Sequence, residues 1–203
     1  MNINATVRAI SREAMLELPI GRYEDEVCLV TTSHDLARAE TDIRQERVVG
    51  FDTETRPAFT RGESYPPCLF QAATARVVYL FQLHRTNAFP LLAEMLSASH
   101  IIKAGVAVAD DLRTLKRVFP VSEKNVVDLG IVARRSGLDQ TGLRNLAGMF
   151  MGIRIPKGVK TSNWAAPHLT AQQITYAATD AWACRELYLR FESLGLLRGN
   201  RPD

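Results

Sequence analysis

The sequence predicts an α/β domain in which helices cover a mixed sheet, and three observations support this prediction. The chain has 203 residues, of which 46% are hydrophobic, and this suits one well-buried domain better than two large ones. Three short apolar segments follow one another between residues 47 and 81, as strands joined in hairpins do. After them, short apolar segments alternate with helical patterns. We therefore expect a polar lead-in over residues 1–26 and one domain over residues 27–203.

The first half of the chain supplies most of the predicted strands. Each is a short run of apolar residues bounded by charged, glycine or proline residues, and together they cover residues 27–30, 47–54, 68–72 and 76–81. A helix that begins at Ser33 or His34 carries apolar residues on one face, and a second helix is expected over residues 89–97.

The second half is predicted to alternate between strands and helices. Strands are expected over residues 101–108 and 126–129, and helices over residues 111–118 and 143–149. A basic loop with glycine and proline covers residues 152–161. A long helix is expected from Thr170 to about Leu194, because Thr170 and Gln173 have the spacing of a capping box.

Charge is distributed unevenly along the chain although the formal net charge is only +3. Residues 1–60 carry 7 basic and 11 acidic side chains, whereas residues 61–203 carry 18 and 11. The small total excludes a histone-like tail, which binds nucleic acid through bulk charge. The uneven distribution predicts local acidic and basic sites instead.

The cysteines and the hydrophobic segments indicate the compartment. Cys28, Cys68 and Cys184 are odd in number and lie at least 40 residues apart, so neither a disulfide framework nor a zinc site is predicted. Charged residues interrupt the segment 1–19, and no apolar run approaches the roughly 20 residues that span a bilayer. We expect a cytoplasmic protein with no membrane partner.

Two carboxylates lie at the end of the predicted buried strand over residues 47–54. Asp52 and Glu54 lie two positions apart, so in a strand they project to the same side. Neighbouring carboxylates repel each other unless a cation lies between them. The pair therefore indicates a metal site, and a solvated strand end is the alternative.

Two further segments place acids at the ends of predicted elements. Asp110 and Asp111 follow an apolar strand where a helix begins, and capping of that helix is the alternative to a role in a site. Tyr176 and Asp180 are one helical turn apart among small residues, which would bury the carboxylate. Hard oxygen ligands of this kind suit Mg²⁺ or Mn²⁺.

The segments 51–54, 105–111 and 176–180, in this order, resemble the three exonuclease motifs of the DEDDy 3′–5′ exonucleases. That family includes ribonuclease D, the proofreading domain of bacterial DNA polymerase I and the Werner-syndrome-type exonuclease. The resemblance covers roughly residues 27–195, and the segment 160–164, Lys-Thr-Ser-Asn-Trp, is similar to the Werner-type branch. Leu112 stands where that branch often has an aromatic residue.

The resemblance implies a ribonuclease H-like (DnaQ-like) fold and a catalytic site that binds two divalent ions, Mg²⁺ or Mn²⁺. It implies that both ions are held by Asp52, that Glu54 and Asp180 hold the one that activates water, and that Asp111 acts on the second. The hydroxyl of Tyr176 would orient the attacking water or accept its proton. The expected reaction releases nucleoside 5′-monophosphates from the 3′ end of a nucleic acid.

Three residues are predicted to contact the single-stranded 3′ end of the substrate. Thr53 lies inside the first motif, Lys160 belongs to the basic loop, and Trp164 could stack on a base. The alternatives are a solvated basic loop and a tryptophan packed beneath it. Nothing in the sequence indicates an oligomeric state.

DNA is slightly favoured as the substrate, because only one helix follows the third motif and no room remains for the extra helical domains of full-length ribonuclease D. The alternatives are ribonuclease D-like processing of RNA 3′ ends, an inactive nucleic-acid-binding module on the same fold, and a metal-dependent phosphatase that acts on a small molecule. The presence of all four acids and the tyrosine argues against the inactive module.

Overall fold

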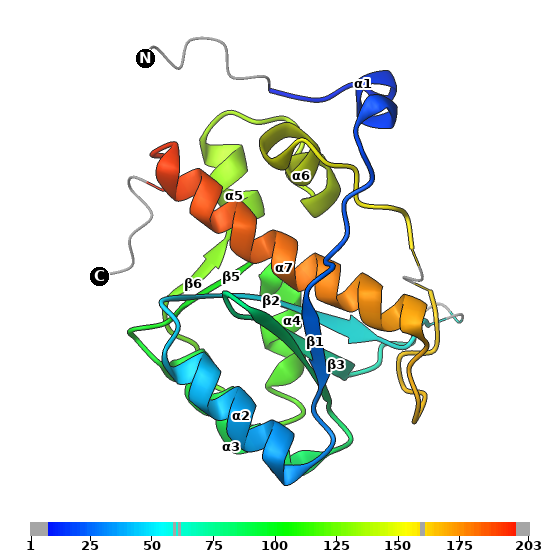
Figure 1. The fold of residues 1–203 in the computed structure, drawn as a ribbon, viewed down its shortest axis with the longest axis vertical. Coiled ribbons are helices and arrows are strands. Elements are labelled where there is room, and N and C mark those ends of the chain that lie inside the picture. The colour runs from blue at the N-terminus through cyan, green and yellow to red at the C-terminus, as the bar shows by residue number, and fades with distance from the viewer. Residues whose placement is uncertain (1–7, 59, 61, 159–160, 198–203) are drawn as a thin grey trace.

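The computed structural model describes residues 8–58, 60, 62–158 and 161–197, and a mixed sheet forms its centre (Figure 1). Its six strands have the order β1-β4-β3-β2-β5-β6. Strands β2, β3 and β4 are antiparallel neighbours, whereas β1 pairs in parallel with β4, and β5 in parallel with both β2 and β6. The strands are β1 Glu26–Leu29, β2 Val48–Thr55, β3 Pro67–Ala73, β4 Val77–Gln82, β5 Ile102–Gly105 and β6 Val126–Asp128.

Helices cover both faces of this sheet. One face carries α2 (Ser33–Arg44), α3 (Phe89–Ser97) and α4 (Val108–Leu115), whose apolar residues pack with side chains of β2, β3 and β4. The long helix α7 (Ala171–Ser193) crosses the other face, and α5 (Leu129–Arg135) and α6 (Leu143–Met151) pack against it (Figure 1). The predicted α/β architecture is therefore confirmed.

Alanines bring α7 unusually close to the sheet. Ala177, Ala178 and Ala181 are fully buried on the side of α7 that faces the strands. A Cβ atom added at Gly50 of β2 would lie 2.2 Å from the carbonyl oxygen of Ala181, so no larger residue fits there. Thr170 and Gln173 form the predicted capping box and set the start of the helix. This close packing places the middle of α7 over β2.

The segment around residue 107 differs from the prediction. The expected strand 101–108 ends at Gly105, and α4 begins at Val108 rather than at residue 111. Ala107 adopts a left-handed conformation with φ of 60°, which ends the strand abruptly. Asp110 and Asp111 both lie in the first turn of α4, so the alternative in which one of them is the N-cap of this helix does not hold.

The carboxylate of Asp128, on the neighbouring strand, takes over that capping function. It accepts hydrogen bonds from the backbone N–H groups of Ala107 (3.2 Å) and Val108 (3.1 Å) at the start of α4. It also accepts from Gly130 and Ile131 and so caps α5, a helix that the sequence reading missed. An Asp followed by apolar residues at helical spacing was the available signal for α5.

Residues 8–25, which include the short helix α1 (Arg12–Glu17), contact α6, α7 and the connection between α5 and α6. The backbone N–H of Ile10 donates to the Gln140 side chain, and that of Tyr23 donates to the Thr179 hydroxyl. The division at residues 26 and 27 stays a prediction. The helices in the described ranges include none that is long and apolar enough to cross a membrane.

Candidate active site

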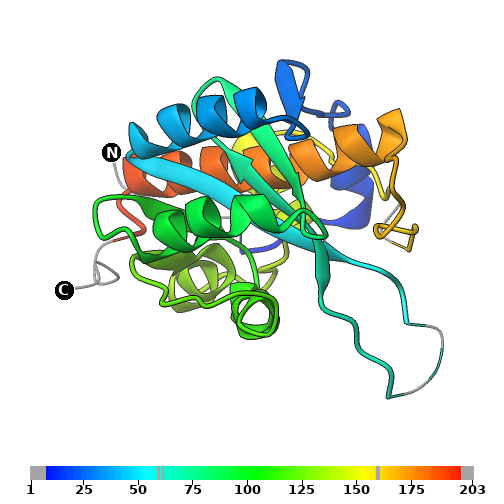
Figure 2. The same ribbon diagram turned by 90° about the horizontal axis from the view of Figure 1, so that it is seen from below.

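A cleft of about 970 Å³ opens at the carboxyl end of β2. Its walls come from α4, α6, α7 and the connection between β2 and β3, which projects away from the body of the domain (Figure 2). The acidic residues that line it are those predicted from the sequence together with one from the connection: Asp52, Glu54, Asp111, Asp180 and Glu63.

Three of these acids form a tight cluster. Asp52 and Glu54 project from the same side of β2, and Asp180 meets them from α7. One carboxylate oxygen from each of the three lies within 4.8 Å of the others. Glu54 and Asp180 are buried, with 8% and 7% of their surface exposed. α7 approaches Gly50 most closely at Ala181, the residue after Asp180, and this approach brings Asp180 to the two acids of β2.

Burial and mutual repulsion raise the pKa of Asp52 well above its usual range. Burial has the larger effect, and the negative charges of Asp180, Asp111 and Glu54 add to it. Such a cluster is favourable only when positive charge enters it or when a proton is shared. Because all three ligands are oxygen atoms, the donor set fits Mg²⁺ or Mn²⁺, as the sequence predicts, and not zinc.

Asp111 approaches the cleft from the opposite face of the sheet. The hydroxyl of Thr53 donates to its Oδ1 atom at 2.6 Å, and the Thr53 backbone N–H donates to Asp52 at 2.9 Å. Burial raises the pKa of Asp111 to about 6, although the Thr53 hydrogen bond opposes this. Asp111 thus lines the same cleft but lies outside the three-carboxylate cluster.

Thr53 lines the cleft, and its contact with the substrate stays a prediction. Its hydroxyl proton is used to hold Asp111, and only 9% of its surface is exposed. It therefore joins the second acidic motif to the first. Because side chains alternate along a strand, Thr53 points to the face opposite that of Asp52 and Glu54, a placement that the sequence pattern already contained.

Tyr176 lies beside the cluster, one turn before Asp180. Burial raises the pKa of its phenol, and the charges of Asp180 and Glu54 act in the same direction. The loop before α7 packs directly on its ring, because a Cβ atom at Gly158 would lie 2.3 Å from Tyr176 Cδ2. The ring of Trp164 lies 6.0 Å from that of Tyr176, measured between centroids.

The two remaining predicted substrate ligands have different outcomes. Lys160 lies outside the described residues. Trp164 has 1% of its surface exposed, so its indole is not placed to stack on a base and belongs to the core under α7, in agreement with the packed alternative. The sequence around Trp164 does not indicate whether the indole is exposed for stacking or buried in the core.

Sequence reasoning missed Arg144 and Arg56 at the rim of the cleft, whereas Lys157 belongs to the basic loop that the sequence predicted. Arg144 of α6 lines it beside Lys157 of the basic loop, and Arg56 lines it from the β2–β3 connection. The guanidinium of Arg56 lies 3.9 Å above the ring of Tyr65. No short motif contains these residues, and only the three-dimensional arrangement brings them together.

The sequence pattern of the family described as 3′–5′ exonuclease matches residues 27–195 of the chain. Among curated proteins, the chain is 32% identical over 164 residues to ribonuclease D of Gluconacetobacter diazotrophicus, covering 79% of the chain and 41% of that protein. It is 32% identical over 154 residues to the mouse bifunctional 3′–5′ exonuclease/ATP-dependent helicase WRN, covering 73% of the chain and 11% of that protein. The chain therefore spans less than half the length of these curated relatives.

A solved structure is also similar to the whole domain. The EXO domain of Nibbler from Aedes aegypti superposes with a TM-score of 0.76 at 22% identity, covering 90% of the chain and 95% of that domain. At this identity the likeness concerns the fold. It confirms the fold class that the three motifs implied.

Proposed function

The chain belongs to the 3′–5′ exonuclease family, and from this premise we propose that it hydrolyses the terminal phosphodiester bond at the 3′ end of a nucleic acid and releases nucleoside 5′-monophosphates. The observation that carries the proposal is the cluster of Asp52, Glu54 and Asp180, with Tyr176 beside it, in a cleft large enough for a terminal nucleotide and its neighbour.

The carboxylates would hold two divalent cations, Mg²⁺ or Mn²⁺. Asp52 would contact both, Glu54 and Asp180 would hold the one beside the attacking water, and Asp111 would hold the second, in part through water. When bound, such ions lower the pKa of water and neutralise the charge that develops on the leaving 3′ oxygen. A polyanionic substrate could not otherwise approach this many carboxylates.

The protein's own contribution beyond metal binding is the position of Tyr176. A phenol ordinarily titrates near pH 10, so the hydroxyl of Tyr176 keeps its proton at neutral pH, and burial acts in the same direction. A neutral hydroxyl can accept a hydrogen bond from the attacking water while it donates to Asp180. This supports orientation of the water, rather than removal of its proton, as the function of Tyr176.

Basic residues from three segments of the cleft lining suit a substrate with more than one phosphate. Arg144 and Lys157 lie on the side of α6 and the basic loop, and Arg56 lies on the β2–β3 connection. Arginine and lysine contacts to phosphate oxygens position a nucleic acid without reading its sequence. We propose that these three residues hold a single-stranded 3′ end over the acidic floor.

RNA is the second candidate substrate, and the similarity to a ribonuclease D favours it. The preference for DNA stays a prediction from the sequence. An inactive binding module would bind either substrate without hydrolysis. A small-molecule phosphatase would hydrolyse nucleotides at a rate independent of oligonucleotide length.

Matched DNA and RNA oligonucleotides, labelled at either end, test the proposal. With Mg²⁺ or Mn²⁺, we expect 3′-labelled strands to release labelled mononucleotide first and 5′-labelled strands to shorten stepwise. EDTA and the Asp52→Asn variant should both abolish this release. Hydrolysis that resists EDTA, or internal cleavage as the first event, would contradict the proposed function.

A further inference from the structure

Gln71 of β3 is a buried polar side chain that the site described above does not use. Its surface is 0% exposed, and neither its Nε2 nor its Oε1 atom has a hydrogen-bond partner among the described residues. The other buried side-chain atoms without a hydrogen-bond partner in the described ranges are the Nε atoms of two arginines. One of these, Arg85, still donates through its Nη1 to a backbone carbonyl. Gln71 is thus the residue whose whole polar group lacks a partner.

An unpaired amide in a protein interior is costly, because the group loses its hydrogen bonds to water and gains none. Gln82 on the adjacent strand β4 shows the usual solution. It is 2% exposed, and its Nε2 donates to the backbone carbonyls of Ala166 (3.1 Å) and Pro167 (3.4 Å). Packing alone would therefore favour an apolar side chain at position 71, and the amide of Gln71 calls for another explanation.

The sheet register places Gln71 directly opposite Asp52. β2 and β3 are antiparallel, and Asp52 and Gln71 are paired residues. Paired residues project to the same face, with Cβ atoms roughly 4.5–5.5 Å apart. The neighbour on the other side of Gln71 is Leu80, and α7, which carries Ala177, Ala181 and Asp180, covers this face of the sheet. Asp52 is thus the polar side chain that the register brings next to this amide.

We propose that Gln71 is a positioning residue for Asp52, and that its Nε2–H group donates a hydrogen bond to the Asp52 carboxylate when cations are bound. Asp52 Oδ1 already accepts the backbone N–H of Thr53. A carboxylate has about four acceptor sites, so a second N–H donor leaves lone pairs for metal. The amide would bind the carboxylate oxygen of Asp52 on the side of β3, and the lone pairs that remain would face the cleft, where a metal can reach them. This inference rests on the proposed function of the cluster.

Gln71→Met tests the inference, and Gln82→Met is its matched control. Both changes replace a buried strand glutamine by an apolar side chain of similar length. The measurements are Mn²⁺ affinity, by isothermal titration or electron paramagnetic resonance, and the Tm of the metal-free protein. Partners of metal ligands are typically worth 10- to 100-fold in metal affinity or activity, and we expect a loss of about that size for Gln71→Met.

The two variants should separate in both measurements. Gln71→Met should keep or raise the metal-free Tm, since it removes an unpaired amide, whereas Gln82→Met should lower the Tm and leave Mn²⁺ affinity unchanged. Excess Mn²⁺ should restore the rate of Gln71→Met. Unchanged Mn²⁺ affinity in Gln71→Met, or a loss of metal-free stability as large as that of Gln82→Met, would overturn the inference.

The proposed function fails in a different way. If the wild-type protein bound no Mn²⁺, or if Asp52→Asn bound it as well as the wild type, the cluster would not be a metal site and both proposals would fall. If the wild type binds Mn²⁺ and Asp52→Asn does not, the function stands, and only the result for Gln71→Met decides the positioning residue.

Discussion

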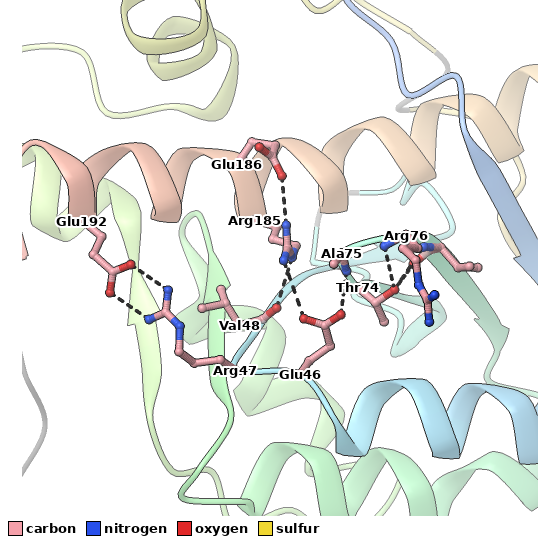
Figure 3. A network of polar contacts seen from close by, with 10 residues as sticks. Glu46, Arg47, Val48, Thr74, Ala75, Arg76, Arg185, Glu186 and Glu192 are labelled. Carbon is pink, nitrogen blue, oxygen red and sulfur yellow. Dashed lines mark hydrogen bonds and ion pairs between the residues drawn. The ribbon is translucent and has the colours of Figure 1, made fainter.

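The charged residues between β2 and α7 are arranged differently at the two ends of β2. At the carboxyl end of β2, Asp52, Glu54 and Asp180 bring negative charges together within 4.8 Å. At the amino end, Arg185 of α7 lies among the acids Glu46 and Glu186, where opposite charges meet (Figure 3). The same helix and the same strand build both ends.

At the amino end of β2, hydrogen bonds and ion pairs connect residues that are mostly shielded from water. The side chain of Arg185 is 14% exposed, and it donates to the Val48 carbonyl at 3.3 Å and to Glu186 at 3.1 Å. Glu46 lies 3.6 Å from Arg185 and accepts from the backbone N–H of Ala75 at 2.7 Å (Figure 3). Here a guanidinium of the chain itself lies between the two acids, whereas the acids at the carboxyl end require a cation from outside. We infer that one end serves stability and the other serves chemistry.

Asp180→Asn should have the largest effect, which is a loss of activity without a loss of stability. Removing one ligand of the metal site costs several kcal/mol of transition-state stabilisation, so we expect a loss of roughly 10³-fold or more in kcat/KM. The metal-free Tm should stay the same or rise, because one of three repelling charges disappears. Nuclease assays and thermal unfolding in EDTA measure the two quantities. A falling Tm would mean that the cluster stabilises the fold.

Arg185→Met should show the reverse pattern. Removing Arg185 leaves the partly buried Glu46 without its ion-pair partner, and the cost of about 3–5 kcal/mol that is typical of fully buried pairs is the upper bound for the loss in the free energy of unfolding. Urea unfolding of the variant measures this cost. Mn²⁺ affinity and the rate of the folded fraction should stay near those of the wild type. Loss of activity in a variant of normal stability would contradict the division between the two ends.

The acidic end could be predicted from the sequence because its information is local. The spacing of Asp52 and Glu54 in a strand, and of Tyr176 and Asp180 in a helix, follows from the periods of these elements. The resemblance to three ordered motifs then related Asp111 to the others. The capping box at Thr170 predicted the start of α7 correctly for the same reason.

The amino end and the rim of the cleft could not be predicted, because their contacts join distant segments. Arg185 and Glu46 are 139 positions apart in the sequence, and each alone resembles an ordinary surface charge. Arg144 and Arg56 meet at the cleft only through the fold. The early start of α4 depended on Asp128, a residue 20 positions away from the helix start that it caps.

The pH dependence of stability should report the burial and mutual repulsion of the carboxylates at the carboxyl end of β2. Burial raises the pKa of Asp111 from 3.8 to about 6 in the folded protein, so between these values the folded state binds a proton that the unfolded state has lost. Stability in EDTA should therefore fall as pH rises from about 4 to 7, by up to roughly 3 kcal/mol from Asp111, and Asp52 acts in the same direction.

Two controls accompany this measurement, which uses urea unfolding at each pH. Asp111→Asn should flatten the profile, since the amide does not titrate. Saturating Mn²⁺ should reverse its slope, because the cation binds the ionised carboxylates of the folded state. A metal-free stability that rises over this pH range would show that the carboxylates are favourably paired within the protein.

The smallest effect should come from Arg47→Gln, which breaks an ion pair at the exposed side of the amino end. Arg47 and Glu192 form two hydrogen bonds of 2.8 and 2.7 Å, a geometry better than that of Arg185 and Glu46, but their side chains are 56% and 42% exposed (Figure 3). Water and salt screen exposed pairs, so we expect a loss below about 1 kcal/mol that shrinks further in high salt. A double-mutant cycle with Glu192→Gln measures the coupling. A cost equal to that of Arg185→Met would show that hydrogen-bond geometry, rather than burial, determines how much the amino end stabilises the fold.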